Sequence, residues 1–417
     1  MFNISIFKYE KLHNILCLIL ICLLPLSLLS GSLIINLFCI LITVIFLFES
    51  FKTKNFIFLK SKDFLILSLF WFFLILNTLL STNFENSVGR GLGFFRFIIL
   101  IFALRYYFTI ENNKYLKFIF NVWLLIFLVV TFDLLFESIF GFNTFGFETV
   151  FEGRLSGFLK DELKIGGYYY GFIIICSSFI YLNFKKYFYI SFFIFLLTAL
   201  LIGERANFLK ILIMSVPFIF LLKYKSDIKI KYFVLLLIFS FTFILIFKPF
   251  YKERYFLSFI EDKKNLNLKN IISKSEKHYA HYSVAYKIFK DNFWFGTGLK
   301  NFRIESGNKK YDYTDFGDLL TTNEKKHLRW STHPHQIHLE FLSETGIIGY
   351  TVFCLFFIFS IFVGLKNYYY FQNLYSISGT LFIITTFLPL IPSGSFFTTF
   401  GATIFWINYS LIGLKKV

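Results

Sequence analysis

Charged residues are scarce in this sequence of 417 residues. Asp, Glu, Lys and Arg together make up 16% of the chain, whereas 57% of it is hydrophobic. Soluble domains carry about 25% charged residues, so this composition excludes a soluble domain of any size. It indicates a polytopic membrane protein.

Cysteines are also few, and their placement indicates neither a disulfide framework nor a zinc cluster. Their number is odd, and each one lies inside an apolar run. The five are Cys17, Cys22, Cys39, Cys176 and Cys354.

Acidic residues are fewer than basic ones, which gives a net charge of +17. In a soluble protein such an excess suggests a nucleic-acid partner. Here the basic residues lie in the connections between apolar segments, where the positive-inside rule expects them. No nucleic-acid partner is therefore expected.

Apolar stretches of about 17 to 25 residues predict an all-α membrane protein with about twelve transmembrane helices. The first stretch follows Lys8 and Lys11 as a signal peptide would, but it is long enough to span and lacks a clear cleavage site, so we interpret it as a retained helix. The predicted spans are 12–30, 33–50, 63–80, 92–109, 115–138, 165–183, 187–202, 206–222, 231–248, 340–364, 374–391 and 398–414.

Basic residues fall on every second connection along the chain, which predicts that both termini are cytoplasmic. The opposite side receives a long loop, 249–339, before the tenth span, and long loops without structure of their own are uncommon unless functional. We expect short helices in it, one of them "HYSVAYKIFKDNFWFG", because Val284, Ile288 and Phe289 recur at helical spacing. The whole chain, 1–417, is expected to form a single transmembrane domain.

Two loops on that opposite side carry candidate phosphate-binding arginines. Arg154 lies in the glycine-flanked stretch "EGRLSGF", where close backbone approach and a forked guanidinium suit a phosphate. The alternative is an interfacial arginine that reaches lipid headgroups. Glu204 and Arg205 form a very short turn between two spans, either as a pair that stabilises the hairpin or as part of a site.

A third polar element is "STHPHQIHLEF", which contains His333, His335 and His338 just before an apolar run. His-x-His-x-x-His spacing is compatible with a metal site, but no cysteine lies near, and Glu340 and Glu344 follow on a helix start. A general acid or base is favoured over a metal ligand, since the ordinary pKa of histidine, about 6.5, suits proton transfer near neutrality. Purely structural roles stay open for His333 and His338.

Taken in order, these elements resemble the O-antigen ligase and polymerase family of bacterial membrane glycosyltransferases. The resemblance covers essentially the whole chain, including the span number and the large loop. Its motifs are "GRLSGFLKDELKIGG", "GERANFL", "DNFWFGTGLKNFR", "HPHQIHLEFLSETGIIG" and "PSGSFFTTFGATIFW". It implies a GT-C-like fold in the bacterial inner membrane with a periplasmic active face.

The resemblance also implies a donor, an acceptor and residue roles. Such proteins move a glycan from an undecaprenyl-diphosphate carrier to an acceptor hydroxyl, without a nucleotide sugar. The family's essential histidine corresponds to His335, here followed by Gln336 where the family usually has asparagine. Arg154 and Arg205 would bind the diphosphate without a metal or other cofactor, and His335 would act as the base in an inverting displacement.

A second departure is His278, where many relatives have arginine. Arg303 and Arg329 are candidate substitutes for that phosphate contact.

Several functions stay open at this point. A ligase that joins the glycan to lipid A-core is preferred, and a polymerase that extends a lipid-linked glycan uses the same donor chemistry. A protein glycosyltransferase of the same superfamily is a third reading. A flippase or other transporter is a remoter one, because it should place charges near mid-membrane, whereas the spans are nearly free of charge except for Asp133 and Glu137 and the polar residues gather on one side.

Overall fold

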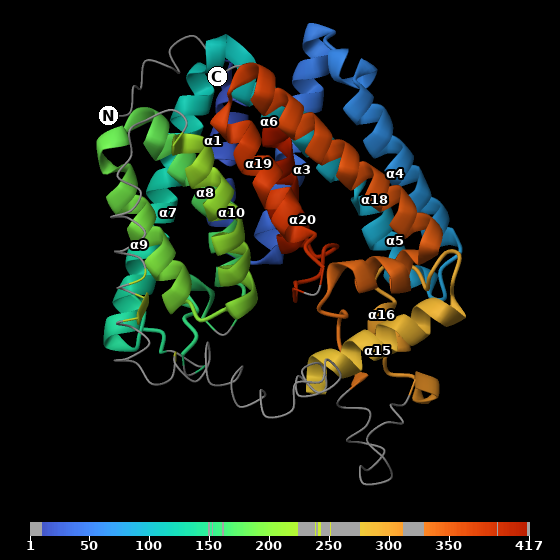
Figure 1. Cartoon of the computed structure of the whole chain (residues 1–417). Coiled ribbons are helices and arrows are strands. Elements are labelled where there is room, and N and C mark those ends of the chain that lie inside the picture. The colour runs from blue at the N-terminus through green and yellow to red at the C-terminus, as the bar shows by residue number, and fades with distance from the viewer. Residues whose placement is uncertain are drawn as a thin grey trace.

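The computed structural model describes residues 11–148, 151, 153–160, 162–223, 238, 241–242, 251, 276–311, 329–389 and 391–414. This part of the chain is helical and contains no strand, only isolated bridges between Phe142 and Glu148 and between Phe151 and Arg154. The all-α prediction is thereby confirmed. The helices, drawn in Figure 1, are α1 (Leu12–Cys22), α2 (Leu24–Ser27), α3 (Ser32–Thr53), α4 (Lys62–Leu79), α5 (Phe84–Gly93), α6 (Phe95–Thr109), α7 (Lys114–Phe140), α8 (Ile165–Asn183), α9 (Phe188–Leu201), α10 (Arg205–Lys223), α15 (Glu276–Asp291), α16 (Phe302–Glu305), α18 (Ile337–Phe371), α19 (Leu374–Thr386) and α20 (Thr399–Ile412).

Many of these helices are apolar enough to lie in a membrane, as the composition predicts. Within the described residues, seven are also long enough to cross one: Ser32–Thr53, Lys62–Leu79, Phe84–Thr109, Lys114–Phe140, Ile165–Asn183, Arg205–Leu222 and Ile337–Phe371. Leu12–Cys22 and Leu374–Thr386 are shorter apolar helices. The predicted span 231–248 lies almost entirely outside the described residues. The count of twelve spans, the location of the termini and the extent of the long loop therefore stay predictions.

Small residues let the central helices approach one another closely. A Cβ on Gly171 of α8 would lie 2.5 Å from Ile404 of α20, and one on Gly379 of α19 would lie 2.3 Å from the Asn408 carbonyl oxygen. The Asn408 side chain donates a hydrogen bond to the Gly171 carbonyl at 3.1 Å. Inside a bilayer no hydrophobic effect drives helices together, so small residues and interhelical hydrogen bonds are the usual means of helix association.

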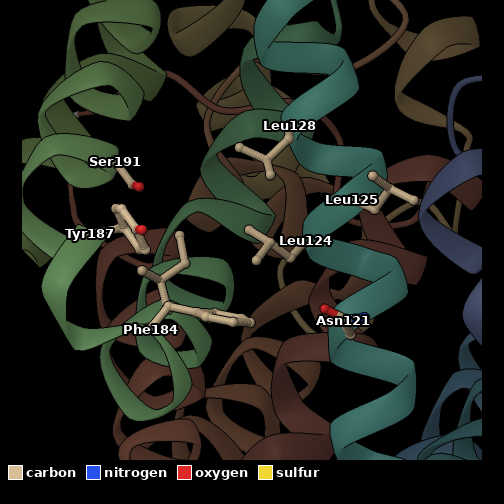
Figure 2. A pocket seen from close by; sticks show the side chains of 8 residues that line it. Asn121, Leu124, Leu125, Leu128, Phe184, Tyr187 and Ser191 are labelled. Atoms are coloured by element: carbon tan, nitrogen blue, oxygen red, sulfur yellow. The ribbon is translucent and has the colours of Figure 1, made fainter. Parts of the chain in front are cut away.

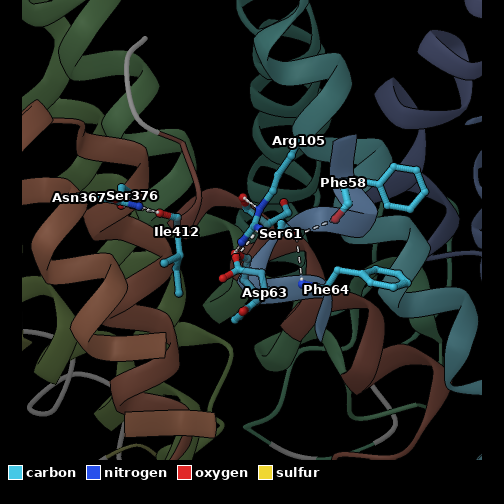
Figure 3. Close-up of polar contacts among 10 residues, drawn as sticks. Phe58, Ser61, Asp63, Phe64, Arg105, Asn367, Ser376 and Ile412 are labelled. Carbon is cyan, nitrogen blue, oxygen red and sulfur yellow. Dashed lines mark hydrogen bonds and ion pairs between the residues drawn. The ribbon is translucent and has the colours of Figure 1, made fainter. Parts of the chain in front are cut away.

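Polar contacts at one end of the bundle tie four helices together (Figure 3). Arg105 of α6 donates through Nη1 to Asp63 at the start of α4 over 2.6 Å, and its Nε donates to the Ser410 carbonyl of α20. Near the end of α18, the Asn367 side chain donates to the Ile412 carbonyl at 2.7 Å. The start of α18, where the histidines lie, is at the other end of that helix.

A hollow of about 330 Å³ lies between α7, the end of α8 and the start of α9, as Figure 2 shows. It is lined by residues that include Asn121, Leu128, Phe184 and Ser191. These residues come from the first half of α7, the end of α8 and the start of α9, whereas Arg154 lies between the end of α7 and the start of α8. The hollow therefore does not belong to the arginine loop.

α18 is broken at Gly346, where φ is 66° and ψ is −172°. The segment that follows α15 binds to the backbone freed by this break. The amides of Thr297 and Gly298 donate to the carbonyls of Ser343 and Glu344, and the amide of Ile347 donates to the Phe293 carbonyl, over 2.8–3.0 Å. The "FWFGTG" sequence is therefore a docking segment, residues 293–298, that joins α15 to a membrane helix.

α15 covers the segment in which a helix was expected. Val284 and Ile288 are both fully buried and contribute to a small separate core with Phe302 and Tyr311. Figure 1 shows α15, α16, the start of α18, the α7–α8 connection and the α9–α10 turn at the same end of the bundle. The candidate residues thus gather at one end.

Candidate functional site

The Arg154 loop rests on the turn that contains Arg205. Gly203 has φ +76°, and a Cβ there would lie 2.0 Å from the Gly153 carbonyl oxygen and 3.4 Å from the Arg154 Cα. The Leu155 amide also donates to the Ile202 carbonyl at 3.2 Å. A glycine is needed at Gly203 because no side chain fits at this contact. The two arginine loops, separate in the sequence, are therefore one structural unit.

Buried carboxylates of α7 hold this loop in place. Glu137, 2% exposed, accepts hydrogen bonds from the amides of Ser156 at 3.2 Å and Gly157 at 2.7 Å. Asp133, 1% exposed, accepts from the amide and the hydroxyl of Thr144 at 2.9 and 2.6 Å. The acidic residues that stood out within a predicted span thus bind loop backbone and position Arg154.

Glu204 links the turn to the start of α8. Its carboxylate accepts from the Gly166 amide at 3.1 Å and from the Asn207 side chain at 2.6 Å. A carboxylate at a helix N-terminus is favoured by the unsatisfied amides and the helix dipole there. This contact fixes the orientation of the turn, and Arg205, an exposed residue, begins α10 immediately after it.

His335 sits in a histidine stack formed by His281, His333 and His335. Its ring lies 5.2 Å from the ring of His281, at 26°, and 4.1 Å from that of His333. His335 has φ 57°, a conformation that few residues other than glycine adopt. The Ser331 hydroxyl lies 3.3 Å from its Nε2, and its carbonyl accepts from the Ser393 amide at 2.9 Å. Strained backbone of this kind clusters at functional sites.

The environment of His333 keeps its ring neutral. Burial first, and then the charges of His335, His281 and Arg303, lower the pKa of His333 to about 3, while a hydrogen bond with Ser393 acts in the opposite direction. The ring therefore carries no charge near neutrality where it contacts the ring of His335. His281, which comes from α15, was missed in the sequence analysis, because only the fold brings α15 against residues 333–335.

His338 and Arg329 are held by contacts of their own. The two ring nitrogens of His338 lie 3.1 Å from the Tyr350 hydroxyl and 2.9 Å from the Phe387 carbonyl oxygen. Arg329, 1% exposed, donates to the carbonyls of Ser306 and Gly307 at 3.1 and 3.0 Å. These contacts favour a structural role for both, and within the described ranges no three His, Cys, Asp or Glu side chains converge as metal ligands.

Cations gather beside the histidine stack. Arg303 acts on the charge of His333, and burial together with Arg303 and Arg90 lowers the pKa of Lys300 below its ordinary value. In the part of the chain that the structure describes, the Arg303 Nε makes no hydrogen bond. Arg90 of α5 was not singled out in the sequence, although its glycine-flanked setting, "VGRGLG", resembles that of Arg154.

Two buried carboxylates of α18 balance part of this charge. Glu340 and Glu344 are each 2% exposed, and both attract Arg90 electrostatically. Glu340 accepts from the Ser395 hydroxyl and from the Phe396 amide, and Glu344 accepts from the Phe302 amide. Both acids are therefore engaged in holding loops around the histidine stack.

Residues 391–401, the stretch that contains "PSGSFFTTF", link the two parts of the site. On one side Ser393 bonds to His335, and the Arg90 side chain donates to the Phe397 carbonyl. On the other side the Phe400 ring lies 3.4 Å from the position of a Cβ on Gly167, next to the α8 start that Glu204 binds. The arginine loops and the histidine stack thus meet a common segment at one end of the bundle.

The comparisons with known proteins fall on the same region. Residues 190–354 match the family model described as O-Antigen ligase. The match runs from α9 to the first half of α18 and includes Arg205, Arg303 and His335. No match was found among the curated proteins.

The apolar helices indicate a multi-pass membrane protein. The match confirms the resemblance read from the motifs, and it supports an O-antigen ligase or polymerase assignment over the residues that it covers. Members of this family are membrane glycosyltransferase-like ligases and polymerases.

Proposed function

We propose that the chain is an O-antigen ligase of the bacterial inner membrane. It transfers a glycan from undecaprenyl diphosphate to a hydroxyl of lipid A-core at the periplasmic face, with inversion and without a metal or other cofactor. The observation that supports this most directly is the contact of the Arg154 loop with the Gly203–Arg205 turn. It brings two cationic loops together at the end of the bundle that carries His335.

The arginines would serve the leaving group. Departure of the diphosphate places negative charge on its oxygens, and a guanidinium can hold two such oxygens through parallel N–H bonds. Preorganised donors aimed at developing charge are the largest single contribution to many enzymatic rates. Arg154 and Arg205 lie on loops fixed by Glu137 and Glu204, so their backbone is preorganised.

His335 would serve the acceptor. Its ring takes the proton from the attacking hydroxyl, the oxygen bonds to the anomeric carbon, and the bond from that carbon to the diphosphate oxygen breaks. A single displacement of this kind inverts the anomeric configuration. His281, stacked on His335, is a positioning residue that sets the plane of the ring.

The acidic residues of α7 argue against transport. A transport pathway would leave ionisable groups facing a cavity near mid-membrane. Asp133 and Glu137 instead bind the backbone of the loop that carries Arg154. Such contacts fit a reaction site at one face of the membrane rather than a pathway through it.

The test is a gel of lipopolysaccharide, with parallel analysis of lipid-linked glycan, from cells with and without the gene. Loss of the gene should leave bare lipid A-core while polymer accumulates on the lipid carrier. Core bearing single repeats would instead identify a polymerase. An unchanged gel would overturn both readings and direct attention to protein glycosylation or transport.

His335→Ala should reproduce the pattern of the gene deletion. The folded protein should persist in the membrane, because the His335 contact with Ser393 is made by its backbone. Near-normal transfer by this variant would remove His335 from the mechanism. Arg329→Met is the matched comparison, since Arg329 binds only loop backbone in the contacts described above, and any loss of transfer there should follow loss of folded protein.

A further inference from the structure

Lys210 of α10 is a buried cation outside the residues assigned so far. It is 3% exposed, and its ammonium lies 5.7 Å from the centre of the Tyr170 ring. Among the described residues, no carboxylate lies within ion-pair distance of it. The acid that acts on its charge, Glu204, already accepts bonds from Gly166 and Asn207. An ionisable residue within a membrane helix is by default a functional candidate.

An apolar groove lies further along α10, and its first lining residue, Ile213, follows Lys210 by three positions. It has a volume of about 520 Å³ and lies where α10 faces α19 and the second half of α18. Its walls include Ile213 and Phe220 of α10, Leu365 of α18, and Leu381 and Thr385 of α19. Phe220 is 60% and Leu365 47% exposed, so the groove is open to the surroundings of the bundle, which in the cell are lipid.

The groove and the ammonium are joined by Tyr170. The Tyr170 hydroxyl lies 2.7 Å from the Thr385 hydroxyl, which lines the groove, while the face of the same ring meets Lys210. Ile213 follows Lys210 by three residues and therefore lies on the same face of α10. Along α10 the order is Arg205, then Lys210, then the groove.

We propose that this groove binds the polyprenyl tail of the lipid-linked donor and that Lys210 binds the phosphate next to that tail. The proposal rests on the function proposed above, and it adds a substrate-binding residue and a lipid path to it. A helix rises about 1.5 Å per residue, so Lys210 lies about 7 to 8 Å from Arg205 along the axis of α10, and in the proposal it takes the second phosphate of the diphosphate. The apolar groove followed by the positive charge of Lys210 matches the donor, in which the apolar tail is followed by phosphate.

A lysine suits this position because it is a compact cation with three donors and no acceptor. A polyprenyl phosphate carries one apolar chain, whereas a phospholipid carries two. We take the polyprenyl phosphate as the occupant, because the donor of the proposed function carries this tail. The Glu204 carboxylate nearby accepts hydrogen bonds from the start of α8 and from Asn207.

The experiment measures binding of undecaprenyl diphosphate, without sugar, to the full-length protein in detergent by native mass spectrometry. Lys210→Met should raise the Kd about tenfold to a hundredfold, as expected for the loss of one charge-assisted hydrogen bond. Lys210→Arg should retain part of the affinity. Undecaprenol, which lacks phosphate, should bind equally to Lys210→Met and wild type, and phosphatidylglycerol should not compete.

The matched control is Lys290→Met. Lys290 of α15 also lies over a tyrosine ring, that of Tyr286 at 4.7 Å, but is exposed. Its Kd should stay unchanged. Ile384→Trp, which places a large ring in the groove, should weaken undecaprenol and undecaprenyl diphosphate alike.

An unchanged Kd in Lys210→Met would overturn the phosphate contact, and so would an equal loss for undecaprenol. Unimpaired binding in Ile384→Trp would overturn the groove, and it remains decisive if Lys210→Met fails to fold. These results are separable from the proposed function. If gene deletion leaves lipopolysaccharide unchanged, the transfer reaction is wrong while the lipid-phosphate site stands or falls by its own binding data.

Discussion

At the scale of single residues, several carboxylates of this protein accept hydrogen bonds from backbone amides. Glu137 binds two loop amides, Glu204 binds the start of α8, and Glu340 binds residues 395 and 396. Leaving one of those amides without a partner in a buried site costs about 1 to 3 kcal/mol. The carboxylates therefore fix the loops on which the arginines and histidines are carried.

Arg205→Lys tests whether the guanidinium is used as a fork. Lysine keeps the charge but cannot hold two phosphate oxygens in parallel, so transfer should fall by about ten- to a hundredfold. The measurement is the rate of glycan transfer by membranes that contain equal amounts of folded protein. Arg303→Lys makes the same change at the arginine beside the histidine stack, and its rate of glycan transfer is measured for comparison. Full activity of Arg205→Lys would show that charge alone suffices.

His333 should make stability depend on pH. Its pKa is about 3 in the folded protein, whereas an unfolded chain has the ordinary value of about 6.5. Between these values the unfolded chain binds a proton that the folded one excludes, so the free energy of unfolding falls as the pH drops from about 6.5. The slope from this group is at most about 1.4 kcal/mol per pH unit.

The readout is the Tm of the purified protein between pH 7 and pH 5. His333→Asn should flatten the decline over this range, because asparagine does not titrate. A decline of equal slope in both proteins would show that other groups cause it. Groups that act on His333 are His281 of α15, Arg303 of α16 and His335 on its own segment, so His281→Asn should shift the same profile less strongly.

At the scale of elements, the break in α18 is the feature that the rest of the site depends on. A regular helix would use its own carbonyls, whereas the break at Gly346 offers Ser343 and Glu344 to residues 297 and 298. Asn77 of α4 adds donors to the carbonyls of Phe295 and Glu344. These hydrogen bonds hold α4, α18 and the segment that follows α15 together.

Gly346→Ala should destabilise the protein strongly. The backbone angles there are essentially confined to glycine, at a cost of about 1 to 3 kcal/mol for another residue. A Cβ would also lie 2.4 Å from the Trp294 carbonyl oxygen, and overpacking adds about 1 to 3 kcal/mol. A lower Tm and faster proteolysis between α15 and α18 should follow.

Gly89→Ala is the matched control. Gly89 lies in α5, and nothing stands within 4 Å of a Cβ there. Alanine is favoured over glycine in a helix by about 0.8 to 1 kcal/mol, so this variant should be neutral or slightly stabilised. If both variants behave alike, the docking of residues 293–298 does not support the fold as described.

At the scale of the whole molecule, the candidate site lies at one end and a polar clamp at the other. Arg105, Asp63 and the ends of α18 and α20 form the clamp, while loops from α7 to α20 meet at the site. Transfer should be insensitive to chelators, since in the proposed mechanism Arg154 and Arg205 would supply the positive charge that a metal supplies elsewhere. The measurement is transfer with and without EDTA, followed by added Mg²⁺ or Mn²⁺; a loss on chelation that the ions restore would contradict the proposal.

Much of the fold could be predicted because its signal is local. Apolar runs of membrane-spanning length gave nearly every described helix, and the spacing of Val284 and Ile288 gave α15. The site could be predicted only in part. Arg154, Arg205 and His335 were named from their motifs, whereas His281, Arg90 and Lys210 were not, because nothing in their local sequence shows which loop or groove they reach.

The sequence by itself determined that this is a helical membrane protein, which residues can bind phosphate or move a proton, and which family it resembles. Those properties follow from hydropathy and side-chain chemistry, which each residue carries wherever it lies. Only the tertiary structure decided that Gly203 brings the arginine loops together, that Glu137 holds one of them, and that residues 293–298 dock at the break at Gly346. These depend on contacts between residues far apart in the chain, and only the close packing of the folded helices creates them.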